Sequence, residues 1–326
     1  MRILIIGGAG MVGRKLAERL AKDGRLGTKD ISHLTLQDVV AAEKPAGAKF
    51  AVDIVTGDLS DPASAPKLVA SKPDVIFHLA AIVSGEAELE FDKGYRINLD
   101  GTRYLLEAVR QAGNKPRIVF TSSIAVFGAP FPDKIGDEFF TTPLTSYGTQ
   151  KAIGELLLAD YTRKGFLRGT AVRLPTICVR TGLPNKAAST WASSVVREPL
   201  TGVDVVCPVT PQTIMVVLSP RKTVDAFMKL HDLPPDAFGP GRTLLLNGIN
   251  VTAKELEQAV TKHAGNRKVG KVVWQHDPAI QAICNGWPQG ISSERSRKLG
   301  FEMDKDLDEV VRHFIADDLD EQMKLV

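Results

Sequence analysis

Residues 1–13 read MRILIIGGAGMVG, a short apolar run that ends in a glycine-rich turn. The run has the length and the β-branched content of a buried strand, and the residues after the turn show the apolar spacing of a helix. In such a unit Gly7 permits a sharp turn, Gly10 lets backbone approach a pyrophosphate, and Gly13 allows helix and strand to pack closely. The start of the helix offers amide groups to the phosphates. The pattern therefore predicts a dinucleotide-binding turn formed by Gly7, Gly10, Met11, Val12 and Gly13.

An acidic residue ends the next predicted strand, where residues 34–38 read LTLQD. A carboxylate at Asp38 would accept hydrogen bonds from the adenosine ribose and repel a 2′-phosphate. No Lys or Arg stands beside it, so we expect NAD rather than NADP, against the alternative of a solvated loop aspartate. Asp58 and Leu59, after the third strand, are expected near the adenine. The alternative for Asp58 is a cap on the helix ahead.

Short apolar runs alternate with helical patterns through the first 175 residues. This alternation is typical of an α/β fold with a doubly wound parallel sheet, the Rossmann architecture. The expected strands are residues 3–6, 34–36, 50–55, 75–79, 118–120 and 170–174. The expected helices are residues 12–22, 63–70, 95–111 and 147–162.

The alternation breaks after Pro175. The stretch 176–220 mixes Pro, Asn, Lys, Ser and Trp with short apolar pieces. Order returns with helical patterns at 222–231, 253–263 and 307–319 and a strand at 243–246. We expect a cofactor domain over residues 1–175 and a smaller substrate lobe over 176–326, with a segment near 211–250 returning to the first domain.

The composition excludes several classes of protein. The chain is 44% hydrophobic and 24% charged, as in ordinary globular proteins, and its net charge of +3 comes from basic residues that form no cluster. Such a chain lacks the footprint of a nucleic-acid-binding protein. Its three cysteines lack metal-ligand spacing and are expected to be buried thiols, with no metal site. The first apolar run is too short for a signal peptide or a membrane span. We expect a cytoplasmic protein.

A tyrosine and a lysine stand four residues apart in the stretch YGTQK, residues 147–151. On a helix this spacing places both side chains on one face. A free tyrosine has a pKa of about 10 and is a poor base at neutral pH. A nearby cation stabilises the phenolate, so Tyr147 could take a proton from a substrate hydroxyl while Lys151 lowers its pKa.

The end of the fifth predicted strand reads Thr121-Ser122-Ser123. Ligands bind at the carboxyl ends of strands in parallel sheets. We expect Ser123 to orient the substrate hydroxyl toward Tyr147. The alternative is a serine that caps the loop after the strand.

Taken together, these motifs resemble the extended short-chain dehydrogenase/reductase family, which includes nucleotide-sugar epimerases and dehydratases. The matching stretches follow the family's order through the N-terminal half of the chain: GGAGMVG (7–13), FHLAA (77–81), NLDGT (98–102), TSSIAVFG (121–128) and YGTQK (147–151).

The resemblance implies that Ser123, Tyr147 and Lys151 form a catalytic triad. It also implies that residues 78–81 line the cofactor, that Asn98 supports the site, and that the subunits dimerise through the helices at 95–111 and 147–162. Phe127 stands where many members have tyrosine. The expected cofactor contacts outside the glycine turn are Asp38, Asp58, Leu59, Leu79, Ala80, Ala81, Asn98, Tyr147, Lys151 and Pro175.

The loop after the sixth strand departs from the nucleotide-sugar members, which tend to carry Arg-x-x-Asn-x-Tyr-Gly-Pro there. This chain reads RLPTICVRTG at 173–182. Together with PNKAA (184–188), REPL (197–200) and SPR (219–221), the loop resembles members that use NAD to oxidise the 2-hydroxyl of a four-carbon sugar acid such as D-erythronate. A small carboxylate substrate calls for a cation or an amide donor. The candidate substrate contacts are Ser84, Ser123, Tyr147, Arg180, Asn185, Lys186 and Arg221.

Some of these polar and aromatic residues could have a structural role instead of binding substrate. The cations could simply be solvated, Arg173 at a strand end is expected to be structural, and Trp191 is expected in the core rather than in a pocket wall. Two other functions compete with a sugar-acid dehydrogenase. One is a nucleotide-sugar epimerase or dehydratase, although a dehydratase would want an acidic residue where this chain has Ile124. The other is a redox-sensing regulator, which has no need of Tyr147 and Lys151 together.

Overall fold

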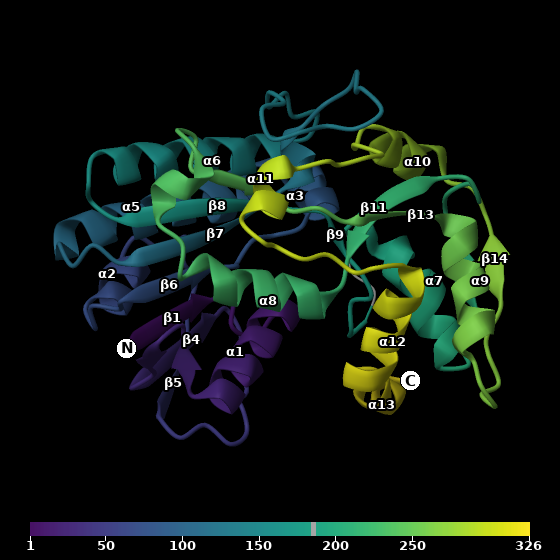
Figure 1. Ribbon diagram of the computed structural model, residues 1–326, viewed down its shortest axis with the longest axis horizontal. Helices are drawn as coiled ribbons and strands as arrows, with labels where there is room; N and C mark the ends of the chain where they lie inside the picture. The colour runs from purple at the N-terminus through teal and green to yellow at the C-terminus, as the bar shows by residue number, and fades with distance from the viewer. Residues whose placement is uncertain (184–186) are drawn as a thin grey trace. The chain divides into compact units, whose positions relative to one another are not determined.

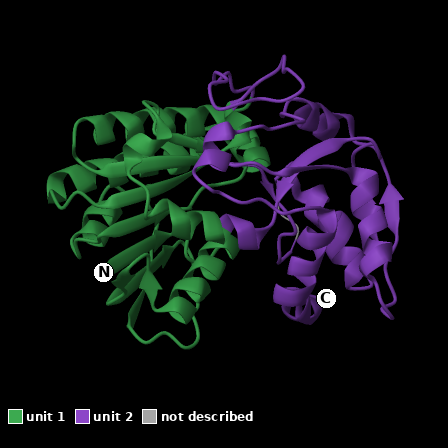
Figure 2. Cartoon of the chain, viewed as in Figure 1, with its two compact units in different colours: residues 1–126, 145–173, 224–244 green, residues 127–144, 174–223, 245–326 purple. Residues whose placement is uncertain are grey.

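The computed structural model describes residues 1–183 and 187–326. Contacts between residues divide the chain into two compact units, shown in Figure 2. Unit 1 comprises residues 1–126, 145–173 and 224–244, and unit 2 comprises residues 127–144, 174–223 and 245–326. The sequence predicted two domains, residues 1–175 and 176–326. The compact units interleave along the chain and do not test that prediction.

Unit 1 is built on a seven-stranded sheet in the order β12-β8-β7-β6-β1-β4-β5. Strand β1 pairs in parallel with β4 and β6, β4 with β5, and β6 with β7. The doubly wound parallel sheet predicted from the alternating pattern is confirmed. Its strands are β1 (Arg2–Ile6), β4 (His33–Asp38), β5 (Ala51–Thr56), β6 (Val75–His78), β7 (Arg117–Ser123), β8 (Arg168–Leu174) and β12 (Thr243–Leu245), and a small hairpin β2 (Arg25–Leu26) and β3 (Lys29–Asp30) precedes β4.

Helices cover both faces of this sheet, because its central strands are apolar on both sides. Helices α5 and α6 lie along one face, and α1 and α8 along the other (Figure 1). The longer helices are α1 (Met11–Asp23), α5 (Gly101–Ala112), α6 (Ser146–Arg163) and α8 (Pro220–Leu230), of which α8 starts in unit 2. The short ones are α2 (Ser64–Val69), α3 (Ser84–Leu89), α4 (Phe91–Gly94), η2 (Ile124–Val126) and η3 (Pro235–Phe238).

The helix expected over residues 95–111 is not uniform. Its first part, η1 (Tyr95–Asp100), is a π-helix that runs directly into α5. A π-helical turn changes which side chains face the neighbouring elements, and periodicity based on 3.6 residues cannot reveal it. Asn98 lies within this turn and is buried.

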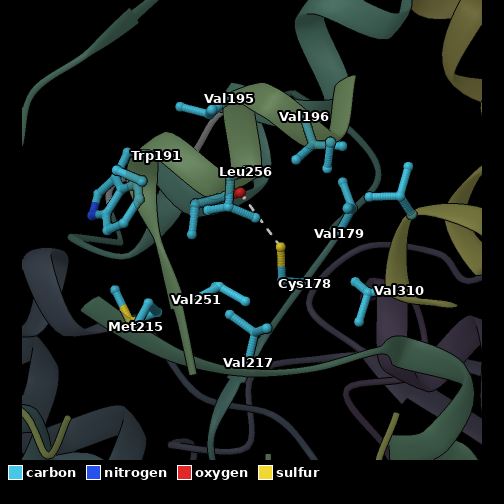
Figure 3. Close-up of a cluster of buried hydrophobic side chains, with 14 of the residues drawn as sticks. Cys178, Val179, Trp191, Val195, Val196, Met215, Val217, Val251, Leu256 and Val310 are labelled. Carbon is cyan, nitrogen blue, oxygen red and sulfur yellow. Dashed lines mark hydrogen bonds between the residues drawn. The ribbon is translucent and has the colours of Figure 1, made fainter. Parts of the chain in front are cut away.

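Unit 2 has a core of its own, drawn in part in Figure 3. All three cysteines are free and buried, and burial raises the pKa of each thiol to about 11. The Cys178 thiol contacts the Ala192 carbonyl oxygen at 3.4 Å, and the Trp191 indole N–H donates to Cys284 Sγ at 3.4 Å. Trp191 is 3% exposed, as expected of a core residue. The cysteines are therefore inert fillers.

The elements of unit 2 are short. Its strands are β9 (Thr176–Ile177), β10 (Val205–Cys207), β11 (Ile214–Leu218), β13 (Ile249–Thr252) and β14 (Val272–Trp274). Its helices are α7 (Thr190–Leu200), α9 (Ala253–His263), α10 (Pro278–Asn285), α11 (Glu294–Lys298), α12 (Leu307–Asp317), α13 (Leu319–Gln322) and η4 (Met323–Leu325). Within the described residues, no helix has the length and apolarity to span a membrane, and no three His, Cys, Asp or Glu side chains could share a metal ion.

Candidate active site and dinucleotide turn

The glycine-rich turn has the geometry that its sequence predicts. Gly7 has φ of +90°, and a Cβ on it would lie 2.7 Å from Ala80 N. A Cβ on Gly13 would lie 2.1 Å from the Gly7 carbonyl oxygen, so only glycine fits there. Gly10 is exposed and forms the N-terminal end of α1, with no side chain bonded to the first-turn amides and no acidic residue in that turn. Met11 and Val12 begin α1, so their amides remain available to a phosphate.

Asp38 ends β4 beside this turn. Its Oδ2 accepts a hydrogen bond from Ala9 N at 3.0 Å, and its Oδ1 accepts one from Val39 N at 2.7 Å. The carboxylate is therefore tied to the glycine turn rather than being a freely solvated loop group. Each oxygen keeps a further lone pair that a ribose hydroxyl could use.

Asp58 and Leu59 follow β5. Asp58 Oδ1 accepts from the amide and the hydroxyl of Ser60, and its Oδ2 accepts from the Arg96 guanidinium at 3.0 Å. These bonds hold the pKa of Asp58 below its usual value against the opposing effect of burial. The helix-cap alternative for Asp58 is wrong, because Ala63 is the capping residue of α2. Leu59 is 5% exposed and its side chain belongs to the core.

The three residues expected to form the triad come from two neighbouring elements of unit 1. Ser123 is the last residue of β7, and its Oγ accepts from Ala125 N at 3.1 Å. Ser123 therefore also caps the turn after the strand, as the alternative proposed. Tyr147 and Lys151 lie one turn apart on α6, whose start is capped by Thr145 Oγ1 accepting from Gly148 N. Tyr147 is partly exposed, whereas Lys151 is 2% exposed.

The ammonium group of Lys151 lies in an unusual environment. Its Nζ donates to the Thr121 carbonyl oxygen at 2.8 Å and lies 4.8 Å from the Phe120 ring centroid and 5.7 Å from that of Tyr147. Among the described residues, no carboxylate lies within ion-pair distance of it. Burial lowers the pKa of Lys151 to about 7, and the charge of Glu155 opposes this shift.

A buried ion pair links α6 to β8. Arg173 on β8 donates from Nε and Nη2 to the Glu155 carboxylate, at 3.0 and 2.7 Å, and Ser122 Oγ donates to Glu155 Oε1 at 2.5 Å. Arg173 is thus structural, as expected from the sequence. The sequence reasoning missed Glu155, although a carboxylate four residues after Lys151 was a signal for it.

The segment after β6 packs against the glycine turn. Leu79 N and Ala80 N both donate to the Ile6 carbonyl oxygen, at 2.8 and 3.0 Å. Ala81 follows them and is partly buried. His78 is 2% exposed, and its Nε2 pairs with Thr102 Oγ1 at 2.9 Å. Burial and the charge of Lys151 lower the pKa of His78 to about 3, so its imidazole is neutral.

The candidate substrate residues have different surroundings. Ser84 is the first residue of α3 in unit 1, whereas Pro175, Arg180 and Arg221 belong to unit 2. The Arg180 guanidinium donates to Ser189 Oγ at 2.9 Å, and Arg221 forms a two-pronged pair with Asp317 at 2.9 and 2.5 Å. Asn185 and Lys186 lie outside the described residues.

These observations fit a dinucleotide in unit 1. The glycine turn leaves no room for side chains where a pyrophosphate would approach. An acidic residue ends β4, and a partly exposed tyrosine stands one turn from a buried lysine at the end of the sheet. A tyrosine beside a lysine is an arrangement that suits hydride transfer with a tyrosine as the base.

Comparisons with known proteins agree with this geometry. The model of the NAD dependent epimerase/dehydratase family matches residues 3–207. D-erythronate dehydrogenase from Cupriavidus necator is 45% identical over 97% of this chain and 98% of its own length. The same enzyme from Haemophilus influenzae is 39% identical over 98% and 100%. A crystal structure described as the nucleoside-diphosphate-sugar epimerase from Agrobacterium tumefaciens is 52% identical, with a TM-score of 0.93 over 99% of this chain and 96% of that one.

Proposed function

The chain belongs to the NAD dependent epimerase/dehydratase family, and we propose that it oxidises D-erythronate to 2-dehydro-D-erythronate with NAD. The observation that carries the proposal is the pair on α6: Tyr147 partly exposed and Lys151 buried without a carboxylate partner among the described residues. Two relatives that match almost the whole chain are D-erythronate dehydrogenases. The loop at 173–182, which lacks the nucleotide-sugar pattern, supports a small acid as substrate.

The residues of unit 1 are suited to holding the cofactor. The glycine turn and the first amides of α1 would bind the pyrophosphate, and Asp38 would accept hydrogen bonds from the adenosine ribose. Residues 79–81 pack against the turn and would line the nicotinamide side. NAD, when bound, supplies the acceptor for the hydride that leaves the substrate carbon.

Side chains of this protein carry out the proton transfer from the substrate. Tyr147 accepts the proton of the substrate hydroxyl, and Ser123 orients that hydroxyl. Lys151 stabilises the tyrosinate with its ammonium charge, which no carboxylate of the described residues neutralises in an ion pair. The neutral His78 adds no second positive charge to the site. General-base catalysis of this kind contributes on the order of 10²–10⁴-fold to the rate.

The substrate carboxylate requires a donor, and the candidates are Ser84, Arg180, Asn185, Lys186 and Arg221. Arg221 already donates from Nε and Nη2 to the two carboxylate oxygens of Asp317. Arg180 donates to a hydroxyl of Ser189. We place Arg180 ahead of Arg221 because Arg221 would have to give up its two-pronged pair with Asp317 to bind a substrate carboxylate.

The proposal is tested with purified protein, NAD and a panel of four-carbon aldonates, by following NADH absorbance. We expect turnover with D-erythronate and a loss of about 10³-fold in kcat for Tyr147→Phe. Absence of NADH with every aldonate would exclude this function. Full turnover by Tyr147→Phe would exclude the mechanism alone.

A nucleotide-sugar epimerase is the second candidate, because the structural relative from Agrobacterium tumefaciens carries that description. Such an enzyme retains NAD tightly and shows no net reduction. Thermal stabilisation by a UDP-sugar, together with no response to aldonates, would favour it. The changed loop at 173–182 and the absence of an acidic residue at Ile124 weigh against it.

We further propose that the protein is a cytoplasmic homodimer. Pairing of α5 and α6 between subunits would cover Leu156 on α6, which is 72% exposed. Light scattering of a Leu156→Arg variant tests this, since a charge in such an interface should release monomers.

A further inference from the structure

Gln150 lies between the two catalytic side chains of α6 in the sequence and is fully buried. It is 0% exposed, and its Oε1 accepts a hydrogen bond from Asn98 Nδ2 at 2.8 Å. Its Nε2 is buried, and no atom of the described residues is its hydrogen-bond partner. An orphaned buried donor costs about 1–3 kcal/mol. A leucine or methionine would avoid this cost, so the amide calls for an explanation.

The partner of Gln150 holds another part of the site. Asn98 accepts from Ile82 N at 2.9 Å through Oδ1 and donates to Ile82 O at 3.2 Å through Nδ2. One amide side chain thus binds both polar backbone atoms of Ile82. These bonds fix which end of the Asn98 amide is oxygen, and the bond to Gln150 follows from that orientation.

The segment that Asn98 holds reaches the glycine turn. Ile82 is two residues after Ala80, whose amide donates to Ile6 O and lies so close to Gly7 that a Cβ there would be 2.7 Å away. A continuous set of contacts therefore runs from α6 through Gln150, Asn98 and Ile82 to the phosphate-binding turn.

The surroundings of Gln150 are shaped for its side chain. A Cβ added to Gly94 would lie 2.7 Å from Gln150 Nε2 and 3.3 Å from the Ala87 Cβ. Any larger residue at Gly94 would displace the amide. The small residues of α3 and α4 therefore provide the room that Gln150 occupies.

We propose that Gln150 is a positioning residue that, through Asn98 and Ile82, aligns the catalytic helix with the segment that lines the cofactor. Its side chain is fully buried, so its role would be exerted through its neighbours. A misplacement of about 1 Å between reacting groups can cost up to 10²-fold in rate. This inference rests on the proposed function for its catalytic consequence, but the mechanical link itself can be measured without substrate or cofactor.

The first experiment is hydrogen exchange on the cofactor-free protein. Gln150→Met keeps the length of the side chain and removes the amide. Gln111→Met, an exposed position on α5 whose amide donates to Glu107, is the matched control. We expect Ile82 N–H to exchange about tenfold faster in Gln150→Met, with amides of β1 and β7 unchanged, and no change at Ile82 in Gln111→Met.

The second experiment is kinetic. We expect Gln150→Met to lower kcat about tenfold with KM for D-erythronate within twofold of wild type, because alignment rather than substrate binding is lost. A cycle with Asn98→Ala tests the route: if Gln150 acts through Asn98, the double variant should lose no more kcat than Asn98→Ala alone.

The outcomes separate the two proposals. Equal acceleration of exchange throughout unit 1, or no acceleration at Ile82, overturns the positioning role and leaves the dehydrogenase function intact. A fully additive cycle, or kcat unchanged in Gln150→Met, overturns it as well. Absence of wild-type turnover with any aldonate removes the proposed function, whereas faster exchange confined to Ile82 would still support the mechanical link.

Discussion

Lys151 of unit 1 and two arginines of unit 2 are held in different ways. In unit 1, Lys151 is buried against a carbonyl oxygen and two aromatic rings, with no carboxylate within ion-pair distance among the described residues. In unit 2, Arg197 is 2% exposed and donates to Glu198 at 2.5 Å, and Arg221 pairs with Asp317. Arginine suits pairs with carboxylates, two-pronged in the case of Arg221, whereas the compact lysine ammonium changes its pKa readily on burial.

This difference separates structural from chemical roles. A cation that is paired with a carboxylate stabilises the fold locally and has little charge left for a ligand. A cation that is held by a carbonyl dipole keeps its charge for a developing anion, at a cost in stability. Unit 1 contains both kinds of cation: Lys151 lies on α6, and Arg173 on β8 pairs with Glu155, which follows Lys151 by one turn of α6.

The largest effect is expected at Lys151. Replacing it with methionine removes the charge that stabilises the tyrosinate, so kcat should fall about 10²–10³-fold. NADH affinity should change less, because most cofactor contacts lie elsewhere. Stopped-flow measurement of NADH formation checks this, and a loss smaller than threefold would break the contrast between Lys151 and the arginines that are paired with carboxylates.

The pH dependence of stability sharpens the same contrast. The pKa of Lys151 is lowered to about 7 in the folded chain, from 10.5. Between these values the unfolded chain binds more protons, so this group makes the free energy of unfolding rise with pH. Below pH 7 the charge is buried at full cost. The free energy of unfolding of Lys151→Met, relative to that of wild type, should therefore be highest at pH 6. This difference should fall by on the order of 3 kcal/mol by pH 10.

This pH prediction is checked by urea unfolding of both proteins across pH 6–10. The difference in free energy of unfolding should shrink steadily as the pH rises. A difference that is independent of pH would show that Lys151 is not buried as an ammonium.

Removing the carboxylate of the buried Arg173–Glu155 pair should lower the stability of the fold. Glu155→Gln leaves Arg173 buried with no full countercharge from position 155, and we expect a loss of about 3 kcal/mol in the free energy of unfolding. Asp160→Asn is the matched control on the same helix, since Asp160 pairs with Arg163 where both side chains are more than half exposed. The control should change stability by less than about 0.5 kcal/mol. Similar losses in both variants would contradict the role of burial.

The smallest effects are expected in unit 2. Arg180→Gln should raise KM for D-erythronate about tenfold if Arg180 meets the carboxylate. Arg221→Gln should change KM less than twofold and stability by less than about 1 kcal/mol, because its pair with Asp317 is partly exposed. The reverse ranking, measured by steady-state kinetics, would show that Arg221 gives up Asp317 for the substrate.

Local patterns predicted much of the fold and of the candidate site. The first strand, the glycine turn and α1 are contiguous, and the helix at 253–263 matches α9 (Ala253–His263) to the residue. The Tyr147 and Lys151 spacing needed only one turn of helix. The structure differs where contacts are distant in sequence: Asp58 binds Arg96 rather than capping α2, and η1 interrupts the expected helix over residues 95–111.

The sequence by itself determined the doubly wound sheet, the glycine turn and the placement of Tyr147 and Lys151 one turn apart on α6, because apolar periodicity, glycine geometry and helical spacing all operate within a few residues. Only the tertiary structure decided how those side chains are tuned. Lys151 meets Thr121 from 30 residues away, Gln150 meets Asn98 from 52 residues away, and Arg221 meets Asp317 from 96 residues away. Burial and charge pairing depend on such long-range contacts, and no local pattern encodes them.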